Sequence, residues 1–288
     1  MILITGATGH LGKAAIQSLL NKGIAARTIA AFVRDESKAS DLKEKGIQIK
    51  VGDYHDYSSL KEALQGVNIL LLISSSDMID RLSQHKNVIN AAVENGVKHV
   101  VYTSIDIKSF EDTAIPYVTQ IHIDTINYLK EKGITFTSLN NTLYCDLIPL
   151  FLGESVWETG VFFPAGEGKA PFASRKEMAE AAAVVLTSSG HENKEYAITG
   201  QTAYSFSDIA KILSEIKEKE IPYHKPSAST YINQLVQAGF PKESAGFFAG
   251  FGEAIKNGEF DTQRSDFEKL LGRKPLELKE FLQQVYVS

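Results

Sequence analysis

Three glycines near the amino end are the residues with the clearest chemical potential. Gly6, Gly9 and Gly12 form a GxxGxxG loop directly after an apolar run and at the start of a helical pattern. In that context Gly6 permits a tight turn, Gly9 lets the backbone approach a pyrophosphate, and Gly12 lets the helix pack closely. The N–H groups of the helix N-terminus then face the anion. We predict a dinucleotide site, with a ligand-free turn as the alternative. Its loop residues are Gly6, Thr8, Gly9, His10, Leu11 and Gly12.

The end of the second apolar run indicates which dinucleotide binds. Folds that bind NAD place Asp or Glu about 20 residues past the loop, on the ribose 2′-hydroxyl. This chain has Arg34 there, and a guanidinium can bind a 2′-phosphate through two hydrogen bonds. Asp35 follows directly and would suit NAD. The sequence therefore favours NADP over NAD; the alternative role of Arg34 is a solvated surface charge.

Alternating strands and helices must position these residues. Apolar runs that predict strands cover 1–5, 28–33, 47–51, 67–73, 98–103 and 134–139. Helical patterns lie between them at about 10–23, 37–46, 58–65, 79–96 and 117–132. This alternation predicts an α/β fold of the Rossmann type, with a doubly wound parallel sheet.

The pattern changes after the sixth predicted strand. Residues 145–175 are rich in Gly and Pro and predict loops, followed by a helix at about 176–189 and a strand near 195–199. From Ser205 onward the pattern is mainly helical. We predict an NAD(P)-binding domain over 1–150, with 172–200 returning to its sheet. A smaller, mainly helical C-terminal lobe, formed by 151–171 and 201–288, would cover the substrate.

Composition excludes several classes of function. The 288 residues carry a net charge of -5, which disfavours nucleic acid as a partner. No apolar run approaches the roughly 20 residues that span a membrane, and the start does not resemble a signal peptide. The single Cys145 fits a reducing cytoplasm. No spacing of His, Cys, Asp and Glu predicts a metal. We expect a cytoplasmic protein without a membrane span or a metal.

Several motifs together resemble the NmrA-like class of extended, atypical short-chain dehydrogenase/reductases. Within that class the chain is most similar to reductases of quinones and triphenylmethane dyes, over residues 1–200. The motifs are the glycine loop, Val33-Arg34, Leu70 to Ser76, Asn87 to Ala92, Gly96 to His99, Tyr102-Thr103-Ser104 and Gly190 to Lys194.

The resemblance implies where NADP would lie. It places the glycine loop, Arg34 and Ser74, Ser75 and Ser76 along the cofactor, and Thr103 follows the next strand at the same sheet edge. A family loop near the nicotinamide corresponds to residues 140–144, which include Asn141 and Thr142. Relatives usually have Arg where this chain has Asn140. Arg175 matches another family Arg near the cofactor, with a surface charge as the alternative.

The Tyr-x-x-x-Lys pair of many relatives is missing. The family spacing puts Val118 at the Tyr position and His122 at the Lys position. Accidental matches at Tyr57–Lys61 and Tyr128–Lys132 lie outside that place in the sequence. His122 and Tyr144 are the remaining catalytic candidates; a structural role is the alternative for His122.

The missing pair separates the reaction classes. Oxidising a sugar hydroxyl needs a base, whereas reducing an electron-poor acceptor mainly needs alignment of donor and acceptor. We therefore expect an NADPH-dependent reductase that delivers hydride, without flavin, to a quinone or a similar planar acceptor. The alternatives are a non-catalytic NAD(P)-binding redox sensor with a regulatory protein partner and, less favoured, a sugar-nucleotide epimerase. Whether the chain forms a homodimer stays open.

Overall fold

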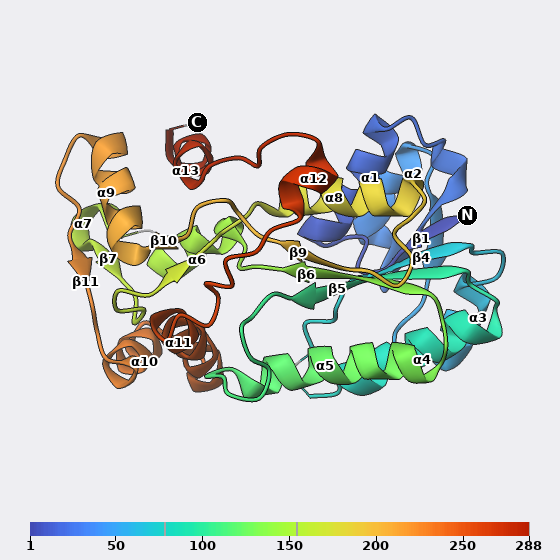
Figure 1. Ribbon diagram of the computed structural model, residues 1–288, viewed down its shortest axis with the longest axis horizontal. Helices are drawn as coiled ribbons and strands as arrows, with labels where there is room; N and C mark the ends of the chain where they lie inside the picture. Colours follow the sequence, from blue (N-terminus) through green and yellow to red (C-terminus); the bar gives the residue numbers. More distant parts are fainter. Residues whose placement is uncertain (78, 154, 288) are drawn as a thin grey trace.

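The computed structural model describes residues 1–77, 79–153 and 155–287 (Figure 1). Its central sheet has seven strands in the order β3-β2-β1-β4-β5-β6-β9, and every pair is parallel. The strands are β1 (Ile2–Ile4), β2 (Ile29–Val33), β3 (Gln48–Val51), β4 (Ile69–Leu72), β5 (His99–Ile105), β6 (Phe136–Asn141) and β9 (Glu195–Ile198). This confirms the predicted doubly wound sheet. Its strand order reverses between β1 and β4, where ligands of such sheets bind.

Helices cover both faces of the sheet (Figure 1). One face carries α1 (His10–Asn21), α2 (Ser40–Glu44), α8 (Arg175–Thr187) and α12 (Phe267–Leu271). The other carries α3 (Tyr57–Ala63), α4 (Arg81–Glu94) and α5 (Pro116–Glu131). Side chains of β4 alternate between the two cores: Leu71 joins the first, and Leu70 and Leu72 join the second. The apolar strand predicted at 67–73 is therefore buried on both faces.

The remaining helices and short strands form a lobe around a third core. Its main helices are α9 (Phe206–Lys217), α10 (Ala228–Gln237), α11 (Lys242–Lys256) and α13 (Leu278–Val287). Two short pairs join β7 (Val161–Phe162) to β11 (Tyr223–His224) and β8 (Lys169–Ala170) to β10 (Tyr204–Ser205). Short 3-10 turns are η1 (Ala26–Thr28), η2 (Glu36–Ala39) and η3 (Cys145–Leu147).

The predicted loop at 145–175 contains more structure than expected. Two one-turn helices, α6 (Ile148–Leu152) and α7 (Val156–Thr159), lie within it. Pro149 occupies the first turn of α6, where its missing N–H costs nothing. Gly153 and Gly160, both with positive φ angles, end the two helices after one turn. Helices this short show no hydrophobic period that could be recognised in the sequence.

The third core begins where the central strands end. Ile107 follows β5, and Leu143 and Cys145 follow β6, and all three are buried with lobe residues. The lobe therefore lies at the carboxyl edge of the sheet. Phe247, Phe248 and Phe251 of α11 are partly buried against the same core. Within the described ranges, no helix combines the length and apolarity that crossing a membrane requires.

Candidate active site

The glycine loop joins β1 to α1 at the point where the strand order reverses. Gly6 has a φ of +57°, and its carbonyl accepts a hydrogen bond of 3.0 Å from the Gly9 N–H. A Cβ on Gly12 would lie 2.3 Å from the Gly6 oxygen, so only glycine fits there. Gly9 is the N-cap of α1 without a side-chain cap, and the first turn holds no acidic residue. The N-terminal N–H groups are thus available to an anion, and the loop geometry fits a pyrophosphate.

The intervening loop residues contribute differently. Gly6, Gly9 and His10 are exposed and Thr8 is partly exposed. Leu11 is buried in the core under α1, so only its backbone could face a ligand.

Arg34 and Asp35 follow β2 and have separate environments. Both Asp35 contacts with Ser37 come through one carboxylate oxygen, which accepts from the backbone N–H at 3.0 Å and from the hydroxyl at 2.6 Å. The hydroxyl and backbone bonds of Ser37 lower the pKa of the Asp35 carboxyl. Asp35 therefore caps η2, while Arg34 is exposed at the carboxyl end of β2. One oxygen of Asp35 is therefore engaged within its own turn, whereas the Arg34 guanidinium is exposed to a ligand.

The segment Ser74–Ser76 follows β4, and two of its backbone N–H groups are hydrogen-bonded to two buried side chains. The Ser74 N–H donates to Thr103 Oγ1 at 2.9 Å, and the Ser75 N–H donates to His85 Nε2 at 3.0 Å. Thr103 thus supports the segment through its own hydroxyl. Ser76 is exposed. The fold brings these predicted residues together beside the glycine loop, because β4 is the neighbour of β1.

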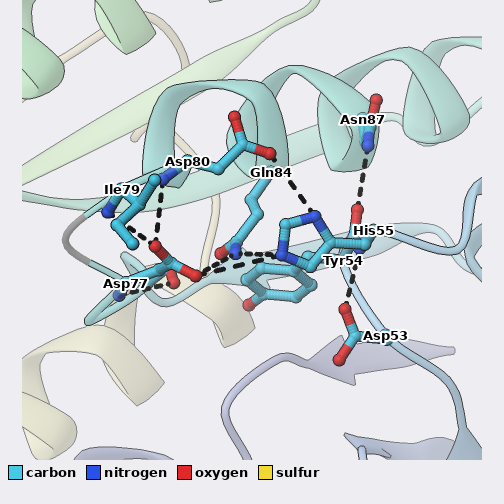
Figure 2. Close-up of polar contacts among 9 residues, drawn as sticks. Asp53, Tyr54, His55, Asp77, Ile79, Asp80, Gln84 and Asn87 are labelled. Carbon is cyan, nitrogen blue, oxygen red and sulfur yellow. Dashed lines mark hydrogen bonds and ion pairs between the residues drawn. The ribbon is translucent and has the colours of Figure 1, made fainter.

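A polar cluster braces the end of the same segment (Figure 2). The Asp77 carboxylate accepts from the backbone N–H groups of Ile79 and Asp80 at 2.7 and 3.0 Å, and from Gln84 at 2.8 Å. His55, from the loop after β3, lies between the two acids: Nδ1 is 3.4 Å from Asp80, and Nε2 is 3.9 Å from Asp77. These contacts tie the loops after β3 and β4 to the start of α4.

The predicted residues after β6 also gather at the carboxyl edge. Asn141 and Thr142 are buried, and the Thr142 hydroxyl has no hydrogen-bond partner among the described residues. The Arg175 guanidinium lies 4.5 Å from the centre of the Tyr144 ring. The backbone N–H of Arg175 donates to the Asp146 carboxylate at 2.9 Å. Burial raises the pKa of the Tyr144 phenol. An unpartnered buried hydroxyl is costly, and it fits a ligand that supplies its partner.

His122 lies within a buried network rather than open to a ligand. Its Nδ1 is 2.8 Å from the Tyr102 hydroxyl, and its Nε2 is 3.0 Å from Nη2 of Arg81. Because guanidinium only donates, Nε2 must accept, and Nδ1–H then donates to Tyr102. Burial, assisted by the charge of Arg81, holds the pKa of His122 well below its usual value. The ring is therefore neutral, and both of its nitrogens are occupied.

His85 is neutral for the same reasons. Thr125 donates its hydroxyl proton to the Ile121 carbonyl at 2.7 Å, so its oxygen accepts from His85 Nδ1–H at 2.9 Å. His85 Nε2 is left to accept from the Ser75 N–H. Burial lowers the pKa of His85 to about 3, and the Arg81 charge acts in the same direction.

Sequence reasoning missed Arg81, His85 and Tyr102, which build this network. One signal was present: Arg81 opens α4, although a cation at a helix N-terminus opposes the helix dipole. The two accidental Tyr-x-x-x-Lys matches are used elsewhere. Tyr57 and Lys61 both bind Glu94, and the Lys132 ammonium lies over the Tyr128 ring.

Across the part of the chain that the structure describes, no three His, Cys, Asp or Glu side chains are grouped to hold a metal ion. The fold and the loop together define a Rossmann-type α/β protein with a glycine loop of the dinucleotide-binding class.

Comparison with known proteins narrows this class. The model of the NmrA-like family matches residues 1–282, and the chain belongs to that family. It is 38% identical to quinone oxidoreductase 2 of Escherichia coli K12, over 99% of both chains.

Solved structures agree over the whole length. The structure of an NADPH-dependent quinone oxidoreductase from Escherichia coli, complexed with NADPH, matches with a TM-score of 0.91 at 35% identity, over 99% of this chain and 100% of that one. Triphenylmethane reductase of Citrobacter sp., complexed with NADP(H), also gives 0.91, at 37% identity over 99% of both chains. The resemblance to quinone and dye reductases is therefore confirmed.

Proposed function

We propose that this protein is an NADPH-dependent reductase that delivers hydride to a quinone or a similar planar, electron-poor acceptor. One observation carries the proposal: the chain matches an NADPH-complexed quinone reductase from end to end, and its own glycine loop keeps the geometry that a pyrophosphate needs.

The described residues suggest a division of work along the cofactor. The glycine loop would bind the pyrophosphate, and Arg34 would bind the 2′-phosphate of NADP. Ser74, Ser75 and Ser76, with Thr103 behind them, would form the middle of the site. Asn141, Thr142, Tyr144 and Arg175 would surround the nicotinamide end. When bound, the reduced nicotinamide supplies the hydride, and these residues align it with the acceptor.

The domain division extends this proposal. Residues 1–150 with 172–200 would bind the nucleotide, and 151–171 with 201–288 would cover the acceptor. The lobe begins at the strand ends where the nicotinamide would lie, so its core would lie beside the reacting atoms. We further propose a cytoplasmic location, consistent with a single, buried cysteine.

A redox sensor is the second candidate, because His122 is neutral and occupied and thus offers no ready proton donor. Such a protein would bind NADP and a regulatory partner without turnover. An epimerase is disfavoured, because the place of the catalytic base holds the buried Val118.

Titration calorimetry with NADPH and NADH, followed by an acceptor screen on the same sample, tests the proposal. We expect tighter binding of NADPH and its oxidation by quinones. Tight NADPH binding with no oxidation by any quinone or dye would favour the sensor instead.

A further inference from the structure

Arg81 has no acidic partner among the described residues. It is the first residue of α4, and its Nε donates to Ser74 Oγ at 3.0 Å. Its Nη2 donates to the same hydroxyl and to His122 Nε2. Both acceptors are neutral. The arginine ion pairs among the described residues involve Arg264 and Arg273, and none involves Arg81.

The environment makes this charge costly. Burial lowers the pKa of the Arg81 guanidinium, and among the described residues the phenols of Tyr102, Tyr144 and Tyr117 act in the opposite direction. The N-terminus of α4 adds a second positive field at the same place. A partly buried cation without a counter-ion raises the free energy of the protein, and binding an anion removes that cost.

One edge of the guanidinium remains available. Guanidinium has five N–H donors, and those of Nε and Nη2 are used by Ser74 and His122. Nη1 donates no hydrogen bond to the described side chains or backbone. It is also not among the unpartnered atoms that are fully buried, so a ligand can reach it. The two N–H groups of Nη1 are thus fixed in direction and open to a ligand.

Arg81 lies away from the proposed phosphate contacts. The proposed phosphate contacts lie at β1, α1 and β2, on one side of the point where the strand order reverses. Arg81 lies on the other side, between β4, β5 and α5, because it binds the residue after β4 and a histidine of α5. By the family spacing, His122 corresponds to the lysine of the Tyr-x-x-x-Lys pair that many relatives carry. Arg81 therefore brings a cation, from a different helix, to the place where the family lysine would stand.

We propose that Arg81 binds the acceptor oxygen that becomes negative during reduction, and that it selects carbonyl acceptors over cationic dyes. This rests on the proposed reductase function. A quinone gains a hydrogen and both electrons from the C4–H bond of the dihydronicotinamide, which is thereby oxidised. An O–H bond forms at one quinone oxygen and the negative charge develops on the other. That oxyanion is held by the Nη1 donors and then takes a proton from water.

A cationic triphenylmethane dye behaves in the opposite way. It accepts hydride at its central carbon and becomes neutral, so no oxyanion forms. The guanidinium repels its positive charge before reduction. The charge of Arg81 should therefore favour the reduction of quinones and disfavour the reduction of cationic dyes.

The test compares Arg81→Met, which removes the charge at similar length, with Arg81→Lys, which keeps it. Arg27→Met, at the exposed η1 turn, is the surface control. For Arg81→Met we expect kcat/KM for menadione to fall about ten- to hundredfold, the range of a lost charge-assisted hydrogen bond. The kcat/KM for crystal violet should stay constant or rise. Arg81→Lys should lie between Arg81→Met and the parent for menadione.

A binding measurement supplies a readout without turnover. In the presence of NADP⁺, the parent should bind the anion of 2-hydroxy-1,4-naphthoquinone about tenfold or more tightly than Arg81→Met does. Thermal melting and NADPH titration accompany each variant, and Arg81→Lys serves if Arg81→Met does not fold.

The outcomes separate this inference from the function on which it rests. Equal losses with menadione and crystal violet, or unchanged binding of the hydroxyquinone anion, would overturn the role of Arg81. A loss confined to NADPH affinity would make Arg81 a cofactor residue and overturn it as well. If the parent binds NADPH but reduces neither acceptor, the proposed function itself fails.

Discussion

The glycine loop and the Arg81 network lie at the same sheet edge, but they prepare for negative charge in different ways. The loop relies on backbone N–H groups within seven consecutive residues, Gly6 to Gly12. The network relies on side chains from several elements, and 41 positions separate Arg81 from His122. The loop carries no net charge of its own, whereas Arg81 carries a full one that neutral neighbours hold in place. The comparison shows that a motif can mark the first kind of site but not the second.

The largest effect should come from the backbone side of this comparison. In Gly12→Ala the new Cβ would meet the Gly6 carbonyl oxygen and the Ala7 Cα, which are backbone atoms and cannot turn aside. We expect a loss of about 1–3 kcal/mol in the free energy of unfolding, and NADPH binding weakened about a hundredfold or more. Denaturant unfolding and calorimetry measure the two effects.

Gly246→Ala is the matched control for that substitution. Gly246 lies in α11 with an ordinary φ, and no atom lies within 4 Å of the place that a Cβ would take, so the change should be neutral or slightly stabilising. If Gly12→Ala behaved like Gly246→Ala, the close approach of α1 would not be what the loop requires.

The next effect concerns the neutral histidines of the network. Burial keeps the pKa of His85 and His122 below 6.5, so below about pH 6.5 the unfolded chain binds protons that the native chain does not. Stability therefore rises with pH in this range and falls on acidification, by about 1.4 kcal/mol per pH unit for each ring. Urea unfolding between about pH 7.5 and 5 should show this decline.

His85→Gln and His122→Gln check its source. Each should be less stable than the parent near pH 7.5, because hydrogen bonds are lost, yet each should lose less stability on acidification. An unchanged slope in both variants would mean that other groups cause the decline.

A smaller effect on nucleotide binding is expected at Arg34, the exposed cation near the glycine loop. Arg34→Met should weaken NADPH binding about ten- to hundredfold and leave NADH binding unchanged, because only NADPH carries the 2′-phosphate. Arg27→Met, before the other end of β2, should change neither. Equal weakening of both nucleotides would show that Arg34 does not bind that phosphate.

The smallest effect is expected for a Tyr-x-x-x-Lys match that has the right spacing but lies on the wrong helix. Tyr57→Phe alters one of the accidental Tyr-x-x-x-Lys matches, whose hydroxyl binds Glu94 on α4. Turnover should be unchanged, and the midpoint of thermal unfolding should shift by no more than about 2 °C. A large loss of turnover would place the reacting groups on α3 and contradict the site described above.

Much of the fold followed from sequence because its signals are local. Strand and helix alternation, and glycines that close helices before the next strand, each involve a few neighbouring residues. The one-turn helices α6 and α7 were missed because four or five residues show no period. Burial of Thr103 beneath Ser74, and of Leu11 beneath its own loop, also depends on which elements pack together.

The order of residues indicated the doubly wound sheet, the glycine loop, the cation after β2 and the absence of the usual Tyr and Lys on α5. It did not show that Arg81 reaches His122, that two histidines are neutral, or that Asp35 caps η2. The difference lies in the range of the interactions. A phosphate loop needs backbone geometry that adjacent glycines encode, whereas the charge state of a buried ring depends on desolvation and on partners that distant segments bring to it.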